Sequence, residues 1–571
     1  MAKSYDLATL RHSAAHLLAQ AVTQLFPNTL LTIGPATKDG FFYDFLPEHT
    51  FKEQDLERIA QRMQELANQN IPITHEQISK EQARKLYKNN PFKLELIDEI
   101  PGDTVGLARQ GDFYDLCKGG HVPSTGDLKH FKLLNISGAY WRADRTKPAL
   151  QRISGTVFPT EQELQDFNQA LLDAEKYDHR RLGKQLDLFS FQDEGVGFPF
   201  FHPHGKRIIN LLIDYMRKKQ DAAGYQEIST PILLNDSLWK QSGHYQHYKD
   251  NMYFCKVDEQ SYAVKPMNCP GSILVYKNRP RSYRELPLRL AEFGLVHRHE
   301  LSGALHGLMR VRAFTIDDAH IYCMPSQIES EIARIITLIK EVLHIFNFHD
   351  IQVALSTRPQ DAMGSDELWN RAIKALEDAL KKTNTPFEVH EGDGAFYGPK
   401  IEFVITDSMG RSWTCSTIQL DFCQPESFDL WYISPQGTKE RPVIIHQAIY
   451  GSLERFFAIL LEHYKGNLPF WLCPIQVQVM TITNAQNEYA QQIAHALQEQ
   501  GIRTQLDISS DQISAKIKSA QEARIPWMIV LGNKEMSANT IALRQRDGTQ
   551  EFGLTLAQLI QKAYDLLQAK K

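Results

Sequence analysis

Several features are scarce in this sequence, and each absence excludes a class of protein. No apolar run approaches the roughly 18 residues that are needed to cross a bilayer, so a membrane-spanning protein is not expected. Asp6, Arg11 and His12 stand where a secretory signal peptide would need an apolar segment. Only seven of the 571 residues are cysteines, an odd number spread widely along the chain. A disulfide framework is therefore not expected, and a reducing compartment, the cytoplasm, is.

The chain also lacks a large excess of charge of either sign. Its 63 Lys and Arg residues nearly balance its 68 Asp and Glu residues, for a net charge of −5. A uniformly basic nucleic-acid-binding surface is thereby excluded, although local basic patches are not. Tandem repeats are missing, as are the Gly-x-x-x-x-Gly-Lys-Ser/Thr phosphate loop and the glycine fingerprint of dinucleotide-binding folds. With 42% hydrophobic and 23% charged residues, the composition is that of an ordinary folded soluble protein.

The length and the changes of pattern along the chain predict a multidomain α+β protein. At roughly 100–200 residues per domain, the length alone predicts about three to four domains. An amphipathic helix over 9–25, strand signals and a charged helix near 160–177 indicate an α+β domain over residues 1–178. A first boundary is therefore expected at residue 178.

Two further domains are predicted after this boundary. Residues 179–468 alternate long helices with strands that are joined by short turns, such as 401–407 and 413–422, which favours an antiparallel sheet. Residues 469–571 alternate strands with helices, which indicates a small α/β domain with parallel pairing.

Two pairs of potential ligands stand out in the first domain. His12 and His16 lie four apart on the predicted helix, so their side chains share one face. Cys117 and His121 have the same spacing. Together the four residues could bind a tetrahedral zinc ion or position an attacking water molecule. The polar residues Lys93, Asp115 and Tyr43 are further candidates for this site.

The central domain contains residues suited to a nucleotide. Arg298 and Glu300 precede a Ser/Gly-rich turn that leads to Arg310 and Phe314. The guanidinium fork of Arg298 matches phosphate or carboxylate oxygens, and Arg310 can reach outer phosphates. Glu300 can accept from an exocyclic amine, and Phe314 can stack on a purine.

The order Arg-x-Glu, loop, Arg-x-x-x-Phe resembles the second signature motif of class II aminoacyl-tRNA synthetases. Gly451-Ser452 followed by Arg455 resembles the third motif, in which the arginine lies over the adenine. A predicted helix at 206–222 and the segment 224–231 are similar to the first, looser motif. That motif forms the dimer interface of the class, so the resemblance implies a homodimer.

Two further groups of residues resemble the threonyl-tRNA synthetases in particular. The segment from Arg11 to His16, with Cys117 and His121, resembles the editing module that this family shares with alanyl-tRNA synthetases. Cys269, His320 and His446 are similar to the three zinc ligands of the family. The resemblance implies one zinc ion per subunit with an open coordination position, where threonine binds through its amino and hydroxyl groups and valine does not.

The resemblance also implies the activity. A threonine–tRNA ligase activates L-threonine with ATP and Mg²⁺, transfers it to tRNA(Thr) and hydrolyses seryl-tRNA(Thr) made in error, because one methyl group provides only about 1–3 kcal/mol of discrimination. The implied residues around threonine, ATP and the transfer step are Asp318, Tyr397, Met267, Lys400, Gln419, Ser452 and His244. The C-terminal domain resembles a class IIa anticodon-binding domain, in which Glu535 and Arg544, with Lys518 as a further candidate, would read the anticodon.

Three positions depart from the family pattern. Gly120, Ser272 and Ile316 stand where members commonly have proline, histidine and glutamine. Two alternatives remain, a synthetase-like RNA-binding regulator without ligase activity and a class II ligase for another amino acid. The complete set of motif arginines and ligand residues favours the threonine ligase. Because relatives commonly begin with a small ubiquitin-like domain, a short form of the family is expected.

Overall fold

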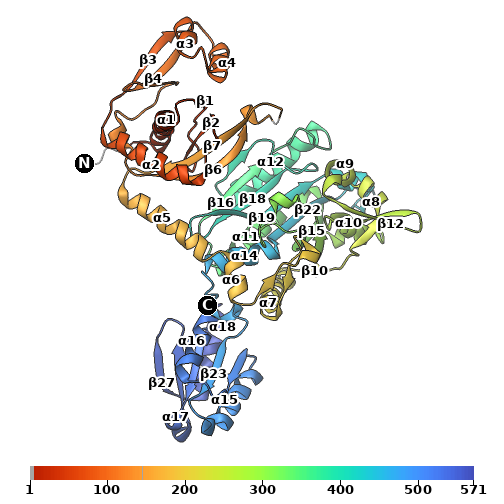
Figure 1. The fold of residues 1–571 in the computed structure, drawn as a ribbon. Coiled ribbons are helices and arrows are strands. Elements are labelled where there is room, and N and C mark those ends of the chain that lie inside the picture. Colours follow the sequence, from red (N-terminus) through yellow and green to blue (C-terminus); the bar gives the residue numbers. More distant parts are fainter. Residues whose placement is uncertain (1–4, 145, 571) are drawn as a thin grey trace. The chain divides into compact units, whose positions relative to one another are not determined.

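The computed structural model describes residues 5–144 and 146–570, which fall into two compact units with their boundary between Leu172 and Asp173 (Figure 1). Among these residues no helix combines the length and the apolar character that crossing a membrane requires. The second unit contains two large and separate hydrophobic cores, one around an eight-stranded sheet and one after residue 469. The three-domain division with boundaries at 178 and 468 therefore stays a prediction that is compatible with these cores.

The first unit combines two antiparallel sheets with helices. The first sheet has the order β1-β2-β7-β6 and the second has the order β3-β4-β5. The elements are α1 (Leu7–Leu25), β1 (Leu30–Leu31), β2 (Phe41–Leu46), α2 (Glu53–Asn68), β3 (Ile73–Ser79), α3 (Lys80–Leu86), α4 (Pro91–Glu99), β4 (Thr104–Gln110), β5 (Phe113–Leu116), β6 (Phe131–Tyr140), β7 (Ala149–Val157) and α5 (Glu161–Lys176). This arrangement confirms the predicted α+β class of the N-terminal part.

Helix α1 differs from the amphipathic helix that its apolar spacing predicts. Every residue from Ser13 to Val22 is buried, including the polar Ser13, His16 and Gln20. The helix packs against α2 and the β2–β7 side of the first sheet, and Gln20 exchanges hydrogen bonds with Gln110 of the second sheet. A helix that is covered on all sides buries polar residues only where they have partners or a function.

The second unit is built on an eight-stranded sheet with the order β10-β14-β15-β22-β19-β18-β16-β17. Its strands are β10 (Gln226–Glu227), β14 (Leu288–His297), β15 (Ala313–Cys323), β16 (Ile351–Ser356), β17 (Glu388–His390), β18 (Lys400–Thr406), β19 (Ser412–Asp421) and β22 (Val443–Ser452). Only the edge strands β10 and β17 pair in parallel, so the predicted antiparallel sheet is confirmed.

Helices cover this sheet and carry several of the predicted motifs. Helix α11 buries a continuous apolar stripe from Ile328 to Leu343 and, together with α14, supplies much of the main core. The helices of this part are α6 (His179–Gln185), α7 (Pro203–Ala222), α8 (Asp236–Gln241), α9 (His244–Tyr248), α10 (Cys269–Lys277), α11 (Ile328–Ile345), α12 (Asp366–Lys382), α13 (Cys423–Ser427) and α14 (Leu453–His463). The short strands are β8 (Phe189–Ser190), β9 (Phe200–Phe201), β11 (Leu233–Asn235), β12 (Tyr253–Val257), β13 (Gln260–Val264), β20 (Tyr432–Ile433) and β21 (Lys439–Glu440).

The C-terminal sheet has the order β24-β23-β25-β26-β27, and it corrects one prediction. Strands β23, β24 and β25 pair in parallel as expected, but β26 and β27 are antiparallel. The link from Leu531 to Ile541 is too short for a crossover, which needs about a dozen residues, so β26 turns back beside β25. The elements are β23 (Val477–Thr481), α15 (Asn487–Glu499), β24 (Thr504–Asp507), α16 (Ile513–Glu522), β25 (Trp527–Leu531), α17 (Asn533–Ala538), β26 (Ile541–Gln545), β27 (Gln550–Leu554) and α18 (Leu556–Ala569).

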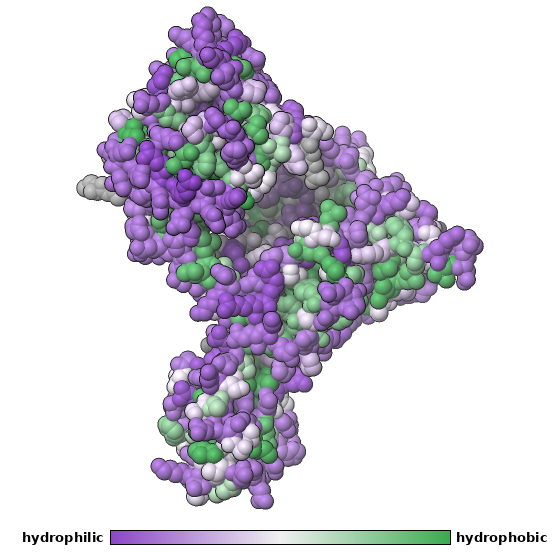
Figure 2. Space-filling view, viewed as in Figure 1, coloured by the Kyte–Doolittle hydropathy of each residue, from purple (hydrophilic) through white to green (hydrophobic). Residues whose placement is uncertain are grey.

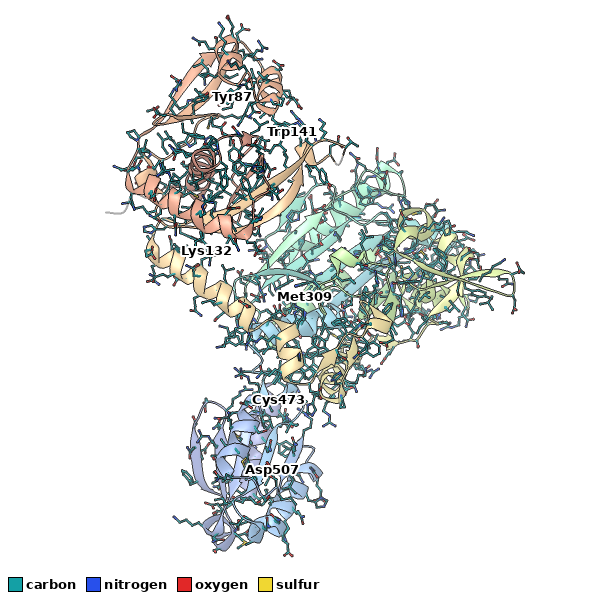
Figure 3. All side chains as sticks on the ribbon, in the orientation of Figure 1. Tyr87, Lys132, Trp141, Met309, Cys473 and Asp507 are labelled. Atoms are coloured by element: carbon teal, nitrogen blue, oxygen red, sulfur yellow. The ribbon has the colours of Figure 1, made fainter. Side chains whose placement is uncertain are left out.

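The surface is mainly hydrophilic, with hydrophobic residues in separate patches on the face that Figure 2 shows. Four of the residues labelled in Figure 3 mark the first unit, the β14–β15 loop and the C-terminal sheet. Tyr87 and Trp141 lie in the first unit, Met309 in the loop that joins β14 to β15, and Asp507 in the C-terminal sheet. Met309 lines the main cavity of the second unit.

Candidate functional site

The register of the central sheet brings two predicted zinc ligands together. His320 on β15 lies directly opposite His446 on β22, and their ring centroids are 4.9 Å apart. Cys269 begins α10 and turns its thiol toward both rings, so the potential ligand atoms of all three residues lie within 4.8 Å of one another. All three side chains are buried.

The chemistry of these atoms fits a metal ion. The Nε2 atom of His320 is buried without a hydrogen-bond partner, whereas Nε2 of His446 lies 2.9 Å from Oδ2 of Asp421. When Nε2 of His446 donates its proton to Asp421, the lone pair of Nδ1 is free to bind a metal ion. A carboxylate in this position is the usual outer partner of a metal-bound histidine. Burial lowers the pKa of His320 well below its usual value, so the ring is neutral as a ligand must be. One thiol and two imidazoles with an open fourth position suit zinc.

The trio lies in a cavity of about 800 Å³ that also collects most of the predicted nucleotide and threonine residues. The predicted residues that line it are Met267, Cys269, Arg298, Glu300, Arg310, Phe314, Asp318, His320, Tyr397, Gln419, His446, Ser452 and Arg455. Lys400 and His244 are not among the lining residues of the described chain. The cavity therefore unites residues of β15, β18, β19 and β22 with residues of the segments beside these strands.

The two predicted residues outside the lining lie directly behind it. His244 is fully buried, with Nδ1 2.8 Å from Oγ of Ser242 and Nε2 3.1 Å from Sδ of Met267. Burial lowers its pKa to about 3, so the ring is neutral near pH 7. Lys400 pairs with Glu402, 3.0 Å away, and Glu402 itself lines the cavity.

The residues predicted to bind threonine include a carboxylate and a phenol. Asp318 accepts a hydrogen bond from Nδ2 of Asn268 at 3.2 Å, and its burial raises its pKa to about 6. Tyr397 donates its hydroxyl proton to Gln419. Both groups line the same cavity as the zinc trio, as an amino-acid site requires.

The residues predicted to bind the nucleotide include the motif arginines. The guanidinium of Arg298 lies over the ring of Phe314, 5.0 Å from its centroid, and donates to the carbonyl of Pro266. Arg310 is largely exposed and pairs with Glu300 at 3.0 Å. Nε of Arg455 is buried without a hydrogen-bond partner in the described structure. An unpaired buried donor of this kind suits a bound anion or an aromatic base.

The side chain of Asp317 holds the backbone at the start of the third motif. Its carboxylate accepts hydrogen bonds from the backbone N–H groups of Ile449, Tyr450 and Gly451 at 3.1, 2.8 and 2.9 Å. Gly451 has φ +72°, a conformation that other residues rarely adopt, and a Cβ atom at this position would lie 2.9 Å from the carbonyl oxygen of Cys415. Neighbouring Ile316, one of the three departures, lines the cavity, whereas Ser272 is buried and bonds to the hydroxyl of Tyr322.

The first unit brings all seven predicted editing residues into one cluster. His12 Nε2 lies 3.1 Å from Cys117 Sγ, and Cys117 Sγ lies 2.9 Å from His121 Nε2. The ligand atoms of His12, His16, Cys117 and His121 lie within 4.8 Å of one another. This cluster could hold a metal ion or a water molecule.

Behind the His/Cys cluster lies a buried ion pair. Lys93 forms a short salt bridge with Asp115 and donates to the hydroxyl of Tyr43 at 3.0 Å, and Tyr43 donates to Asp115 at 2.6 Å. Burial raises the pKa of Asp115, but the charge of Lys93, the neighbouring His16 and the hydrogen bonds from Lys93 and Tyr43 together outweigh burial, so the net pKa lies below its usual value. Burial lowers the pKa of His16 to about 3 and that of His121 to about 4, so both rings are neutral near pH 7.

Ser13 is a member of this site that the sequence reasoning missed. Its hydroxyl donates to the carbonyl of Thr9 at 2.9 Å and accepts from the N–H of Val122 at 3.1 Å. Since its single proton is used for Thr9, the 3.1 Å contact with Nδ1 of His121 requires the proton on that Nδ1. Nε2 of His121 therefore presents a lone pair to Cys117, as a base or a ligand must.

The loop between Cys117 and His121 has an unusual backbone. Gly119 and Gly120 both adopt positive φ, +100° and +82°. His75 bonds through Nε2 to the carbonyl of Cys117 at 3.1 Å and lies beside Gly119. Proline is restricted to φ near −65°, so the glycine at position 120 belongs to a loop path that proline could not follow.

The C-terminal candidates are not gathered into a cavity in this way. Glu535 lies in the first turn of α17, where one carboxylate oxygen accepts from the N–H of Gly532 at 2.9 Å. Arg544 lies on β26 and is half-buried, with Nε unpartnered in the described structure. Lys518 is within reach of Glu522, one helical turn away. Their role stays a prediction.

Asp421 and Asp317 were also missed, and no sequence signal could have found them. Each acts through a strand neighbour that is remote in sequence, His446 for Asp421 and Gly451 for Asp317. Only the pairing of β19 and β15 with β22 brings them close. Ser13, by contrast, stands between His12 and His16 on the predicted helix, and this position beside two predicted ligands was a signal that the sequence offered.

Three family models match the chain. They are the tRNA synthetase class II core domain (G, H, P, S and T) over residues 253–464, the anticodon binding domain over 476–565, and the threonyl and alanyl tRNA synthetase second additional domain over 105–154. Among solved structures, the RNA binding domain of threonyl-tRNA synthetase from Cryptosporidium parvum has a TM-score of 0.66 at 43% identity, and the match covers 68% of this chain and 98% of that one. A prolyl-tRNA synthetase from Giardia lamblia, at 18% identity and a TM-score of 0.55, shares the fold.

Curated relatives cover almost the whole chain. The threonine–tRNA ligase of Carboxydothermus hydrogenoformans is 54% identical over 546 residues, which are 95% of this chain and 86% of that protein. The threonine–tRNA ligase of Clostridium tetani is 50% identical over 557 residues, with 97% and 87% covered. The resemblance seen in the sequence motifs is thus confirmed over nearly the full length, and the chain belongs to the threonyl-tRNA synthetase family.

Proposed function

We propose that this chain is a threonine–tRNA ligase that activates L-threonine with ATP, transfers it to tRNA(Thr) and hydrolyses seryl-tRNA(Thr). The observation that carries the proposal is the cavity that holds Cys269, His320 and His446 together with the class II arginines. A site for a metal-bound amino acid beside a nucleotide site is what threonine activation needs. The first reaction joins the threonine carboxylate to the α-phosphorus of ATP, with pyrophosphate as the leaving group.

Cys269, His320 and His446 would hold one zinc ion per subunit. When bound, zinc supplies a Lewis-acid position that distinguishes an amino acid with a hydroxyl group from its isostere valine. Asp318 accepts from the threonine hydroxyl, Tyr397 bonds to the amino group, and Met267 lies beside the amino acid, whereas Gln419 borders the ATP site. Because a hydroxyl-specific site leaves these polar groups unpaired when valine enters, its rejection is strong.

The nucleotide is held by the motif residues. Arg298 contacts both the α-phosphate and the threonine carboxylate, and Arg310 contacts the outer phosphates. Arg455 lies over the face of the adenine. Glu300 accepts from the adenine amine, and Ser452 and Lys400 border the ATP site. Mg²⁺ would accompany the phosphates and reduce their charge during the displacement.

In the second reaction a terminal ribose hydroxyl of the tRNA attacks the threonyl carbonyl and AMP leaves. His244 lies behind Met267 with a neutral ring and would assist that attack. At the other end of the tRNA, Glu535 and Arg544 would contact anticodon bases. The segment around α7 would form a homodimer interface, as in other class II enzymes.

The His/Cys cluster of the first unit is the proposed editing site. Its neutral histidines can orient a water molecule or a metal ion toward the ester of seryl-tRNA. The Lys93–Asp115 ion pair and the hydroxyl of Tyr43 line the site behind them. A separate hydrolytic site is needed because the synthetic site separates threonine from serine by only one methyl group.

Exchange of pyrophosphate into ATP tests the synthetic function. Threonine should support exchange, serine should support it weakly, and valine should give only background. No threonine-dependent exchange above background would contradict the ligase and favour a regulator that binds RNA. Exchange that is driven better by proline or serine would favour a class II ligase for another amino acid.

Hydrolysis of preformed seryl-tRNA(Thr) tests the editing function separately. The double variant His12→Ala with Cys117→Ala should lose this hydrolysis and retain threonine-dependent exchange, because the two sites are built from different residues. Normal hydrolysis by the double variant would remove the cluster from the editing assignment.

A further inference from the structure

His179, the first residue of α6, is fully buried and uses both nitrogens of its ring. Nε2 lies 3.0 Å from the backbone nitrogen of Leu308, and Nδ1 lies 2.6 Å from Oε1 of Glu462. Leu308 and Glu462 belong to remote segments of the chain. His179 therefore joins the β14–β15 loop to helix α14.

The protonation of this ring follows from its partners. The backbone N–H of Leu308 is a donor only, so Nε2 must be the lone-pair acceptor. Nδ1 then carries the proton and donates it to the carboxylate of Glu462, which also accepts the backbone N–H of His179 at 2.9 Å. The ring is neutral and has one tautomer, because any other state would lose one of the two bonds.

Glu462 is itself fixed. It is 1% exposed, and its second oxygen lies 2.5 Å from the guanidinium of Arg411. It lies one residue before the end of α14, the helix whose first turn carries Arg455 of the third motif. The carboxylate is thus a rigid acceptor, held on the helix that carries one ATP-site arginine.

The other partner of His179 belongs to the loop that carries a second ATP-site arginine. Gly307 packs directly on the imidazole, since a Cβ atom at this position would lie 2.1 Å from Nε2 of His179. Leu308 is buried, and Arg310 follows two residues later with its side chain largely exposed at the cavity. Among the described residues, the guanidinium of Arg310 has Glu300, at 3.0 Å, as its side-chain partner, so its direction depends on the backbone of this loop.

We propose that His179 is a positioning residue for ATP: through Leu308 it holds the loop so that Arg310 faces the outer phosphates, and through Glu462 it ties that loop to the helix of Arg455. The inference rests on the proposed function, because it assumes that Arg310 meets the phosphates. His179 itself touches no substrate, so its effect must pass through Arg310. No residue of the zinc trio contacts it in the described structure, and threonine binding should be independent of it.

A double-mutant cycle tests this with two readouts, calorimetric binding of Mg-ATP and threonine-dependent pyrophosphate exchange. His179→Ala should weaken ATP binding and raise the KM for ATP by about tenfold, the usual effect of losing one buried hydrogen bond, with the KM for threonine changed less than twofold. In an Arg310→Ala background, His179→Ala should change ATP binding less than twofold. An equal loss in both backgrounds, or an equal rise in the KM for threonine, would show a merely structural role and overturn the inference.

His463→Ala is the matched control. His463 follows Glu462 on α14 and also accepts a backbone N–H, that of Ser408 at 3.1 Å, but it does not contact the β14–β15 loop. ATP binding should stay within twofold of the unmodified protein. If His179→Ala does not fold, an ester in place of the Leu308 amide removes the same N–H donor and should produce the same tenfold loss; unchanged ATP binding would overturn the inference. If the unmodified protein binds ATP but supports no exchange, the ligase proposal fails while the binding cycle still decides the role of His179.

Discussion

His320 and His446 face each other across the antiparallel strands β15 and β22, with their ring centroids 4.9 Å apart. This relationship depends on register, because a slip of one residue would turn one of the rings to the opposite face of the sheet. Asp318 lies two residues before His320 on the same strand and therefore on the same face, toward the same cavity. One pairing thus places the proposed metal ligands and the acceptor of the threonine hydroxyl together.

Cys269→Ser should remove zinc and threonine activation together. Serine has no thiolate, and a site with two imidazoles and one hydroxyl binds zinc far more weakly than a site with a thiolate. Zinc content by elemental analysis should fall from about one per chain to well below half, and threonine-dependent exchange should fall by at least 100-fold. Hydrolysis of preformed seryl-tRNA should be unchanged.

Cys255→Ser is the control for this substitution. Cys255 is exposed on β12, a strand of a three-stranded sheet that is separate from the sheet of β15 and β22. Its replacement should leave zinc content and exchange as they are. Full zinc retention in Cys269→Ser would remove this thiol from the ligand set.

Ser13→Ala should slow hydrolysis of seryl-tRNA by about tenfold while threonine-dependent exchange stays the same. Without the hydroxyl, Nδ1 of His121 loses the acceptor that keeps its proton there. The ring can then place its proton on Nε2 and no longer offers a lone pair to the site. Nitrogen NMR of the His121 ring should show the Nδ1–H tautomer in the unmodified protein and a mixture in the variant.

Thr23→Ala provides the comparison on the same helix. Within the part of the chain that the structure describes, Thr23 bonds to carbonyls of its own helix, at Ala19 and Gln20, so its loss should leave hydrolysis unchanged. If Ser13→Ala hydrolyses seryl-tRNA at the normal rate, Ser13 has only a packing role in α1.

Gly120→Pro should abolish hydrolysis of seryl-tRNA, although proline is the common residue of the family at this position. The φ of +82° is inaccessible to proline, so the loop that aims His121 must change its path. Gly120→Ala is the matched variant, since a Cβ atom here meets nothing within 4 Å and only the cost of positive φ, about 1 kcal/mol, remains. It should retain most of the hydrolysis. Equal activity of the proline and glycine forms would show that the loop accepts a second path.

The sequence alone was sufficient for the parts of the fold and site that depend on local pattern. Helix 9–25, the antiparallel strands and the motif arginines were all found from spacing or resemblance, and the structure confirms the elements. What escaped were partners created by tertiary pairing: Asp421 beside His446, and His179 between Leu308 and Glu462. These contacts leave no periodic signal in the sequence.

The antiparallel pairing of β26 with β25 was not predicted from the sequence, for a different reason. Strand signals alone do not set direction, and only the short link after β25 decides between a crossover and a return. The continuous burial of α1 was likewise invisible, because small and polar residues such as Ala14, Ser13 and Gln20 resemble a solvent-facing stripe until a second sheet covers them.

Glu454→Gln should flatten the pH dependence of stability. Glu454 lies in the first turn of α14, accepts from the N–H of Thr315 at 2.9 Å, and has a pKa that burial raises from 4.5 to about 7. The folded protein thus holds a proton that the unfolded chain releases above pH 4.5, so this group stabilises the fold fully below that pH. Its contribution of about 3 kcal/mol is lost as the pH rises through 7.

Melting midpoints measured from pH 4.5 to 8 should fall less steeply in Glu454→Gln than in the unmodified protein. Glu367→Gln, at an exposed position of α12, is the control and should follow the unmodified curve. Parallel curves for the two variants would show that Glu454 is ionised throughout this range and is held as a carboxylate by Thr315 and Ser452.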